Sequence, residues 1–453
     1  MSLTYHLIDA LIVNEGKTSR GSLEISDGRI GKIVYGNESL PADNHAIIIN
    51  CSGCFVIPGV IDDHVHFREP GLTYKSDIFT ESRAAIAGGI TSFMEMPNTI
   101  PAATTVDLLE QKYDIAAGKS LANYSFYMGA TNDNAAEIAK IDSEKVCGVK
   151  VFMGSSTGNM LVDDSKALET LFANSRGLLI AIHSEDEDII RKNNRLFREQ
   201  YGEDVPPECH PLIRSEEACY RSTAKAITLA LKHNTRLHVL HLSTARELTL
   251  FDNTLSLEDK RITSEVCLHH LWFNDTDYKK WFNLIKVNPA IKTENDRQAL
   301  FHGLLSGKID VIATDHAPHT LKEKKLTYFK ALSGGPMVQH SLVAMLEFYH
   351  EGKISIEKVV EKMCHAPALC FRVRKRGFIR TGYHADLIII NPASAWKVDK
   401  TNILSKCGWS AMEGNIFKSK ITHTFVNGNL VFHDGTFDER YRGERLLFDM
   451  SQR

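Results

Sequence analysis

The chain has 453 residues, of which 43% are hydrophobic and 24% are charged. This balance is typical of a folded globular enzyme and excludes a fibrous or disordered chain. The 53 Lys and Arg residues nearly cancel the 56 Asp and Glu residues, so no overall basic charge is available for nucleic acid or an anionic membrane. We therefore expect no nucleic-acid partner and no membrane partner. An anionic substrate would have to be bound by local charges.

The N-terminal sequence lacks the basic start, apolar centre and cleavage site of a secretory signal, and no apolar run approaches the length of a bilayer span. Nine scattered cysteines favour reduced thiols over a disulfide framework. These features predict a cytoplasmic location. Cys51 and Cys54 form a single C-x-x-C, which is a weak signal for zinc or redox chemistry. Two small residues before a strand are the simpler interpretation.

Residues 1–55 alternate in the manner of short β-strands, and Asp27 with Gly28 indicates a hairpin turn. From Phe55 onward, apolar runs alternate with longer helix-compatible stretches, which is typical of parallel strands joined by crossover helices. Eight runs are candidate strands: VIPGVID, ITSFMEM, YSFYMGA, VCGVKVFM, LLIAIH, RLHVLH, LIKVN and DVIATD. Eight such units predict an α/β fold, a (β/α)8 barrel of the TIM type.

After Ala368 the sequence returns to β-type alternation, with Asn427 and Gly428 as a second hairpin signal. We expect residues 56–368 to form the catalytic barrel. Residues 1–55 and 369–453 would together form a smaller β-rich lobe with a C-terminal tail. No repeat of fixed period and no low-complexity tract is present, which excludes a solenoid.

The most specific motif is DDHVHFREPG, which begins at Asp62 and ends the first predicted barrel strand. Its two histidines, His64 and His66, lie two residues apart. On a strand, both imidazoles therefore project from the same face and can share a metal ion. Taken alone, this pair could equally be two surface histidines on a loop.

Four more potential metal ligands end other predicted strands: Lys150, His183, His241 and Asp315. The carboxyl ends of barrel strands meet at one mouth, so five strands would deliver metal-compatible groups to the same place. Any one of these residues could be a structural core residue, but their coincidence predicts a metal site.

Lys150 lies among apolar residues, where a buried ammonium is costly. Carboxylation by carbon dioxide would convert it to an anionic carbamate whose two oxygens can bridge two cations. An ion pair with a nearby carboxylate is the alternative interpretation.

Four motifs together make the chain resemble the dihydroorotases of the longer, bacterial type within the amidohydrolase superfamily. They are D-x-H-x-H-x-R-E-P-G at Asp62, MPNT at Met96, NPAIK at Asn288 and TDHAPH at Thr314. The resemblance covers nearly the whole predicted barrel and its flanks. It implies the reversible cyclisation of N-carbamoyl-L-aspartate to L-dihydroorotate in de novo pyrimidine biosynthesis, with one of these small molecules as the substrate.

The resemblance also implies a metal centre with two Zn2+ ions per chain and a hydroxide between them. One Zn2+ would be held by His64, His66, carboxylated Lys150 and Asp315, and the second by the same Lys150, His183 and His241. Asp315 would serve as the general acid and base.

Four further positions correspond to the family's substrate contacts. Arg68, Asn98 and His319 would bind the exocyclic carboxylate of the substrate, and Asn288 would bind the ring amide. For Arg68, a structural ion pair with a neighbouring carboxylate is the alternative. Family resemblance also suggests a homodimer, the commonest symmetric assembly.

One loop departs from the family pattern. Residues 333–347 read SGGPMVQHSLVAMLE, where many relatives carry a sequence resembling PFGIxGLE, so we expect the contacts to the substrate ring to differ from the family pattern. Another cyclic amidase on the same barrel, such as an allantoinase or hydantoinase, is one alternative. Arg68 argues against it because a neutral hydantoin ring has no carboxylate. A noncatalytic scaffold homologue is the other alternative, but such homologues typically lose metal ligands, and every ligand position is filled here.

Overall fold

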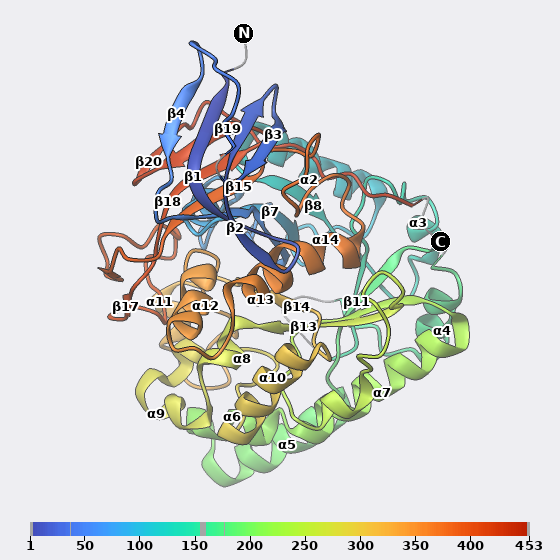
Figure 1. Cartoon of the computed structure of the whole chain (residues 1–453). Helices are drawn as coiled ribbons and strands as arrows, with labels where there is room; N and C mark the ends of the chain where they lie inside the picture. The colour runs from blue at the N-terminus through green and yellow to red at the C-terminus, as the bar shows by residue number, and fades with distance from the viewer. Residues whose placement is uncertain (1–2, 37, 155–159, 176, 451–453) are drawn as a thin grey trace.

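The computed structural model describes residues 3–36, 38–154, 160–175 and 177–450. Both ends of the described chain meet in one β-rich lobe, which lies at the top of Figure 1 above the barrel. The lobe strands are β1 (Tyr5–Asn14), β2 (Lys17–Ser26), β3 (Arg29–Tyr35), β4 (Ile47–Asn50), β5 (Phe55–Pro58), β15 (Leu387–Asn391), β18 (Lys420–Val426), β19 (Asn429–His433) and β20 (Thr436–Phe437). Their order is β20-β19-β18-β15-β5-β1-β2-β3, with β4 paired to β1.

The two predicted hairpin turns are confirmed. Asp27 and Gly28 have φ values of 49° and 75° between the antiparallel strands β2 and β3. Asn427 and Gly428 have φ values of 48° and 77° between β18 and β19. Positive φ at both central residues is the requirement of a type I′ turn, whose twist matches that of the strands it joins.

The barrel strands run parallel to their neighbours. They are β6 (Val60–Val65), β7 (Ile90–Glu95), β8 (Asn123–Phe126), β9 (Met128–Gly129), β10 (Val149–Phe152), β11 (Leu179–His183), β12 (Arg236–Val239), β13 (Ile262–Cys267) and β14 (Val311–Ala313). The hydrogen-bonded orders are β6-β7-β8 and β14-β13-β12-β11-β10-β9. Only Tyr127 separates β8 from β9, and a bridge between Val65 and His316 joins the first strand to the last. The predicted (β/α)8 barrel is confirmed.

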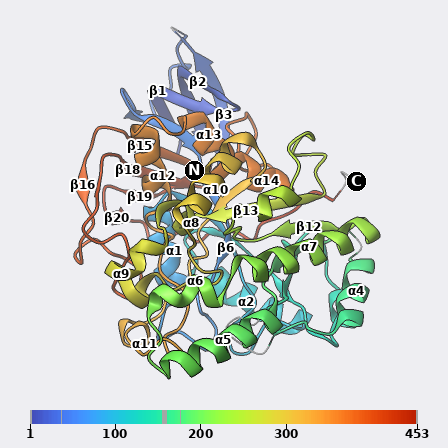
Figure 2. The same ribbon diagram turned by 90° about the horizontal axis from the view of Figure 1, so that it is seen from below.

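Helices surround the barrel, and both views show α4, α5 and α7 outside its strands (Figures 1 and 2). The helices are α1 (Ile78–Ala87), α2 (Val106–Lys119), α3 (Ala135–Ile138), α4 (Ser165–Ala173), α5 (Glu187–Tyr201), α6 (His210–Ile213), α7 (Glu216–His233), α8 (Leu268–Trp272), α9 (Tyr278–Trp281), α10 (Glu294–Ser306), α11 (Leu321–Lys324), α12 (Ser341–His350), α13 (Ile356–Val360) and α14 (Ala366–Phe371). Thr105, Asp186, Ser215 and Thr293 cap longer helices by accepting a backbone N–H.

Shorter elements complete the fold: η1 (Pro207–Cys209), η2 (Glu247–Leu250), η3 (Asp275–Asp277), η4 (Phe282–Ile285), η5 (Glu361–His365), β16 (Trp396–Lys397) and β17 (Ile416–Phe417). The nine cysteines are free. Among the described residues, no helix combines the length and apolar character needed to cross a bilayer.

One predicted strand was wrong, and another extends over two strands of the structure. The run VIPGVID contributes to two strands, β5 in the lobe sheet and β6 in the barrel. Gly59 separates these strands in the sequence. The run LIKVN is not a strand, since its first residues end the 3-10 turn η4. The seventh barrel strand is instead β13, which reads ITSEVC. Its polar side chains are buried because they bind polar groups inside the barrel, so the strand has no continuous apolar run.

Candidate metal centre and active site

A cavity of about 30 Å³ lies at the carboxyl ends of the barrel strands. It is lined by His64, His66, Arg68, Lys150, Phe152, His183, His241, Asn288, Asp315, Ala317, Ser333 and Gly334. All six predicted metal ligands are therefore brought to one place, together with two of the four predicted substrate contacts, Arg68 and Asn288.

Three ligand atoms converge on one side of this cavity. The Nε2 atoms of His64 and His66 lie 3.2 and 3.1 Å from the same oxygen, Oδ1 of Asp315. The histidines come from the end of β6, and Asp315 follows β14 across the closing point of the barrel. These three buried groups offer ligand atoms within 4.8 Å of one another. Two imidazoles and a carboxylate suit a divalent cation such as Zn2+.

His183 and His241 form a second converging pair. Nδ1 of His183 lies 2.9 Å from Nε2 of His241. Burial lowers the pKa of His183 and holds that of His241 well below its usual range, so both rings are neutral. Neutral imidazole is the form that ligates metal ions. In the described part of the chain, Nδ1 of His241 is buried without a hydrogen-bond partner.

Lys150, on β10, lies between these two groups of ligands as part of the same cavity wall. Its Nζ lies 4.8 Å from the centre of the Phe152 ring, and no carboxylate of the described residues is within ion-pair distance. Burial lowers its pKa to about 7. The side chain is therefore available as a neutral amine, and the alternative of a paired structural lysine is not what the structure shows.

The ligands on β6 are oriented by hydrogen bonds to their second ring nitrogens. Nδ1 of His64 donates to Oε1 of Glu265 over 2.7 Å, and Nδ1 of His66 donates to Oδ1 of Asn98 over 2.7 Å. Each contact occupies Nδ1 and leaves Nε2 as the nitrogen that faces Asp315. Such partners fix the tautomer and the ring orientation of histidine ligands. Asn98 therefore touches a metal ligand and does not line the cavity.

Glu265 is in turn contacted by a buried histidine, His238. Nε2 of His238 lies 3.1 Å from Oδ2 of Asp63 and 3.6 Å from Oε2 of Glu265. Although burial opposes the charge, hydrogen bonds to these two carboxylates raise the pKa of His238 to about 9. An imidazolium therefore lies between two acidic side chains, one of which contacts the candidate ligand His64. The sequence analysis did not identify these residues.

A second buried carboxylate was also missed. Oε2 of Glu185 lies 2.9 Å from Nε2 of His183 and is paired with the guanidinium of Arg214. Although burial opposes ionisation, Arg214 and His183 hold the pKa of Glu185 well below its usual range. The signal that could have revealed it is its position two residues after a predicted ligand, on the same face of an extended segment.

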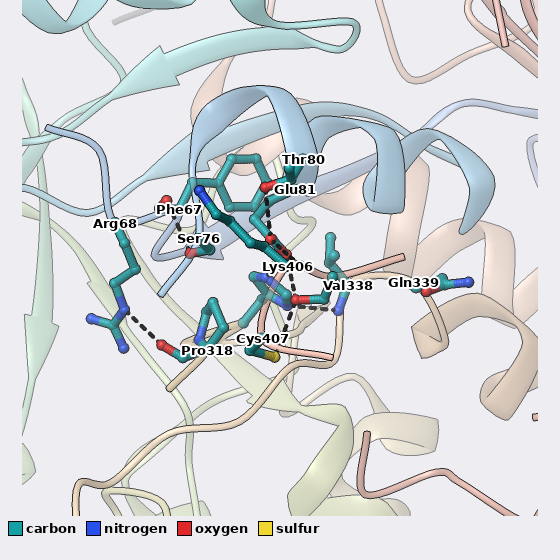
Figure 3. Close-up of polar contacts among 12 residues, drawn as sticks. Phe67, Arg68, Ser76, Thr80, Glu81, Pro318, Val338, Gln339, Lys406 and Cys407 are labelled. Atoms are coloured by element: carbon teal, nitrogen blue, oxygen red, sulfur yellow. Dashed lines mark hydrogen bonds and ion pairs between the residues drawn. The ribbon is translucent and has the colours of Figure 1, made fainter. Parts of the chain in front are cut away.

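The segment that carries Asp315 is fixed by its neighbour His316. Nε2 of His316 lies 2.9 Å from Oε2 of Glu81, and its Nδ1 accepts the backbone N–H groups of Met337 and Val338 at 3.0 and 3.2 Å. Glu81 also accepts the backbone N–H of Lys406 over 3.0 Å, and Figure 3 labels Glu81, Lys406 and Val338 close together. Helix α1 and the loops after β14 are therefore connected directly behind the segment that carries Asp315.

Backbone strain is concentrated at the candidate site. Arg68, His241 and Asp315 have φ values of 70°, 39° and 45°. These angles lie in the left-handed region, which residues with a Cβ rarely adopt. Strained residues of this kind cluster at functional sites, where the surrounding structure holds them in place.

Arg68 lies between the metal ligands and the loop that follows β14. Its Nε donates to the carbonyl of Pro318 over 3.1 Å, as Figure 3 shows, and its Nη2 lies 3.0 Å from Nε2 of His319. The alternative role of Arg68, an ion pair with a neighbouring carboxylate, is absent among the described residues. Asn288 faces the same cavity, and its Oδ1 is buried without a hydrogen-bond partner in the described chain.

The atypical loop forms one wall of the cavity through Ser333 and Gly334. Gly334 has a φ of 131°, and a Cβ there would lie 2.5 Å from the carbonyl oxygen of Ala317. Only glycine fits this position. Nζ of Lys324 donates to the carbonyls of Leu332 and Gly334, each over 2.8 Å. These hydrogen bonds fix the backbone of the loop that forms the cavity wall.

Comparison with known proteins gives the family. Residues 55–431 match the amidohydrolase family. The chain belongs to the amidohydrolase family. Members of this amidohydrolase family are metal-dependent, and the converging ligand groups described above fit that requirement.

Curated relatives within the amidohydrolase family extend over almost the whole chain. A protein named dihydroorotase from Pyrococcus furiosus is 31% identical over 449 residues, which cover 96% of each chain. Another of the same name from Methanosarcina acetivorans is 30% identical and covers 97% of this chain and 95% of its own. These relatives are archaeal, whereas the motifs had suggested a resemblance to the longer bacterial type.

Solved structures agree with the fold of the amidohydrolase family. An L-hydantoinase from Arthrobacter aurescens superposes with a TM-score of 0.89 at 25% identity, covering 96% of this chain and 97% of its own. A dihydropyrimidinase from Brevibacillus agri gives a TM-score of 0.87 at 20% identity, with 96% of each chain covered. The second likeness concerns the fold alone.

Proposed function

We propose that the protein is a dihydroorotase, which catalyses the reversible cyclisation of N-carbamoyl-L-aspartate to L-dihydroorotate in de novo pyrimidine biosynthesis. The observation that supports it best is the position of Arg68. Its guanidinium lies in the wall of a cavity that also contains six metal-compatible side chains. A cation there matches a ring substrate with an exocyclic carboxylate. The full-length dihydroorotase relatives support the same activity.

The proposed metal centre would hold two Zn2+ ions, with carboxylated Lys150 as a ligand available to both. His64, His66 and Asp315 belong to one ion, and His183 and His241 to the other. When bound, the metal pair supplies an activated water and polarises the carbonyl under attack. Lys150 supports this arrangement because a buried amine with a pKa of about 7 has the neutral form that reacts with carbon dioxide.

Asp315 is the proposed proton carrier. Although burial opposes ionisation, His64 and His66 hold its pKa well below the usual range, so the carboxylate is ready to accept a proton. In hydrolysis it accepts the proton of the attacking water and delivers it to the leaving ring nitrogen. In cyclisation the same transfers run in reverse.

The substrate contacts follow from the groups around the cavity. Arg68 and His319 donate to the exocyclic carboxylate, and Asn98, which lies outside the cavity lining, orients His66 beside them. Oδ1 of Asn288 accepts the ring N–H, which would give this buried oxygen a partner. The protein is proposed to act as a homodimer, which sedimentation velocity would test.

The deciding experiment is turnover of the purified protein with dihydroorotate, with hydantoin and allantoin in parallel and total zinc measured on the same sample. The proposal requires strong activity on dihydroorotate and about two zinc ions per chain. Activity on a neutral ring alone would mean another cyclic amidase. Zinc without any activity would mean a scaffold homologue.

The variant that tests the key contact is Arg68→Met. Removing the guanidinium should lower kcat/KM for dihydroorotate by about 100-fold or more, because a charge-assisted contact to the carboxylate is lost. Zinc content and the circular dichroism spectrum should be unchanged. Equal activity of the variant would eliminate the carboxylate-binding role.

A further inference from the structure

Lys75 is a buried cation beside the candidate carboxylate pocket, and the proposed roles do not use it. Its side chain is 6% exposed, and its Nζ lies 3.1 Å from Oε1 of Glu323. The same Nζ lies 3.0 Å from Nδ1 of His319. Lys75 therefore contacts the histidine that stands next to Arg68, from the side opposite the cavity.

This contact determines which nitrogen of His319 carries the proton. Burial and the cations Arg68 and Lys75 hold the pKa of His319 well below its usual range, so the neutral ring has a single N–H. An ammonium group has donors and no acceptor. Lys75 is paired with Glu323, and as an ammonium it donates to Nδ1, which places the proton of the neutral ring on Nε2. There it donates to the carbonyl of Ser333 over 3.0 Å.

Arg68 faces the same nitrogen. Its Nη2 lies 3.0 Å from Nε2 of His319, and a guanidinium also has no acceptor. In this tautomer Nη2 of Arg68 finds no acceptor on the ring, and the Nε2–H has only the carbonyl of Ser333. An anionic oxygen placed beside the two nitrogens would accept from Nη2 and would share the Nε2–H with that carbonyl.

The opposite tautomer would remove this arrangement. Oε2 of Glu323 lies 3.9 Å from Nδ1 of His319, so without Lys75 a small shift would let the carboxylate accept an Nδ1 proton. Nε2 would then accept from Arg68, and the guanidinium would be occupied by a neighbour before substrate arrives. The contact to Ser333 would also be lost.

We propose that Lys75 is a positioning residue for substrate specificity, which holds His319 in the Nε2–H tautomer so that His319 and Arg68 donate together to the substrate's carboxylate. This inference rests on the proposed function, since it requires a substrate that carries a carboxylate at Arg68.

The kinetic test compares Lys75→Met, Lys75→Arg and the control Lys353→Met. Lys353 is half-exposed and paired with Glu351 over 2.7 Å, so the control removes a lysine and an ion pair away from the cavity. Lys75→Met should raise KM for dihydroorotate about 10- to 100-fold, the effect of one charge-assisted hydrogen bond, with kcat and zinc content little changed. Lys75→Arg keeps a donor and should restore most of the affinity. An unchanged KM in Lys75→Met would overturn the inference, and so would a parallel loss of kcat and zinc, which marks a structural role.

The tautomer itself is measured by NMR of protein labelled with 15N-histidine, with the His319 signals assigned from their loss in His319→Gln. Wild type should show a protonated Nε2, and Lys75→Met should show the proton on Nδ1. A wild-type ring protonated on Nδ1 would contradict the inference. Failure of the proposed function looks different, because wild type itself would then not turn over dihydroorotate, whatever the tautomer of His319.

Discussion

At the scale of single residues, the candidate site is defined by polar groups whose surroundings fix their protonation. His183 and His241 are neutral because they are buried, and Asp315 is ionised because two imidazoles face it. Lys150 is the least expected member, since it is a basic side chain among basic ligands. Each protonation state suits a cation at the centre of the cavity, and two of the residues allow direct tests.

Lys150→Ala should lose bound zinc and turnover together. The substitution removes the only group proposed to contact both metal ions, and no carboxylate of the described chain is within ion-pair distance to replace it. Activity should fall by at least about 1,000-fold, since metal activation of water is lost. Zinc analysis by mass spectrometry and turnover on the same sample measure both effects. A variant with full zinc and full activity would show that Lys150 is not a ligand.

Asp315→Asn should separate binding from catalysis. The amide keeps an oxygen that can face the cation but cannot carry a proton between the water and the leaving nitrogen. We expect most of the zinc to be retained and turnover to fall by roughly 100- to 10,000-fold, the range of general acid–base contributions. Lys150→Ala, which should lose both, is the matched comparison. Wild-type activity in Asp315→Asn would assign the proton transfer to another group.

At the scale of elements, the sequence could predict those strands whose buried faces are apolar. The strand β11, LIAIH, and the strand β12, RLHV, are of this kind, and both end near a candidate ligand. β13 was not predicted because Glu265 and its neighbours are polar. Glu265 is tolerated in the interior since it binds His64, which is 201 residues away in the sequence. No local pattern contains that information.

The same limit applies to the site. Strand ends were enough to predict where His64, His66 and Asp315 would meet, because the carboxyl ends of barrel strands converge. The groups that orient them come from distant segments. His316, for example, contacts Glu81, 235 residues earlier in the chain. Such contacts depend on the three-dimensional packing of loops, which composition and periodicity do not specify.

The loop that forms the cavity wall has its own internal support, which predicts a pH effect. Nζ of Lys286 donates to the carbonyls of Tyr328 and Ala331, each over 2.6 Å. Burial lowers its pKa from 10.5 to about 7, and a neutral amine has one N–H for each carbonyl. As pH falls from 10.5 to 7, the unfolded chain gains a proton at this residue and the folded chain does not. The free energy of unfolding therefore falls over this range and levels off below pH 7.

Lys286→Met removes this contribution. The difference in the free energy of unfolding between wild type and variant should grow as pH rises from 7 to 10, and urea titrations at several pH values would measure it. The two carbonyls left without a donor should also destabilise the variant by about 1–3 kcal/mol. A difference that stays constant across this pH range would show that Lys286 is charged in the folded protein.

At the scale of the whole molecule, the lobe and the barrel are joined by buried polar contacts. Asp386, next to β15 in the lobe, accepts from Nδ2 of Asn123 on the barrel strand β8 at 3.3 Å and from the backbone N–H of Asn427 at 2.7 Å. It also pairs with Arg376, and the two side chains are 3% and 4% exposed. One carboxylate therefore connects the barrel to two lobe segments, and the two parts should unfold together.

Asp386→Ala should strongly lower the free energy of unfolding, because it removes this contact between the lobe and the barrel. The substitution leaves the buried guanidinium of Arg376 with only the exposed carboxylate of Glu444, 3.5 Å away, and the loss of a buried partner typically costs up to about 3–5 kcal/mol. The exposed pair of Asp434 and Lys420, at 3.1 Å, offers a matched control. Asp434→Asn breaks this ion pair, which water can replace, and suits the φ of 44° at this position, so it should change stability by less than about 1 kcal/mol. Urea unfolding followed by circular dichroism compares the two variants. Since the proposed ligands lie at the barrel mouth, the Asp386→Ala variant should keep its zinc and its turnover under conditions where it is folded. Equal stability of the two variants would show that the lobe and the barrel do not depend on this contact.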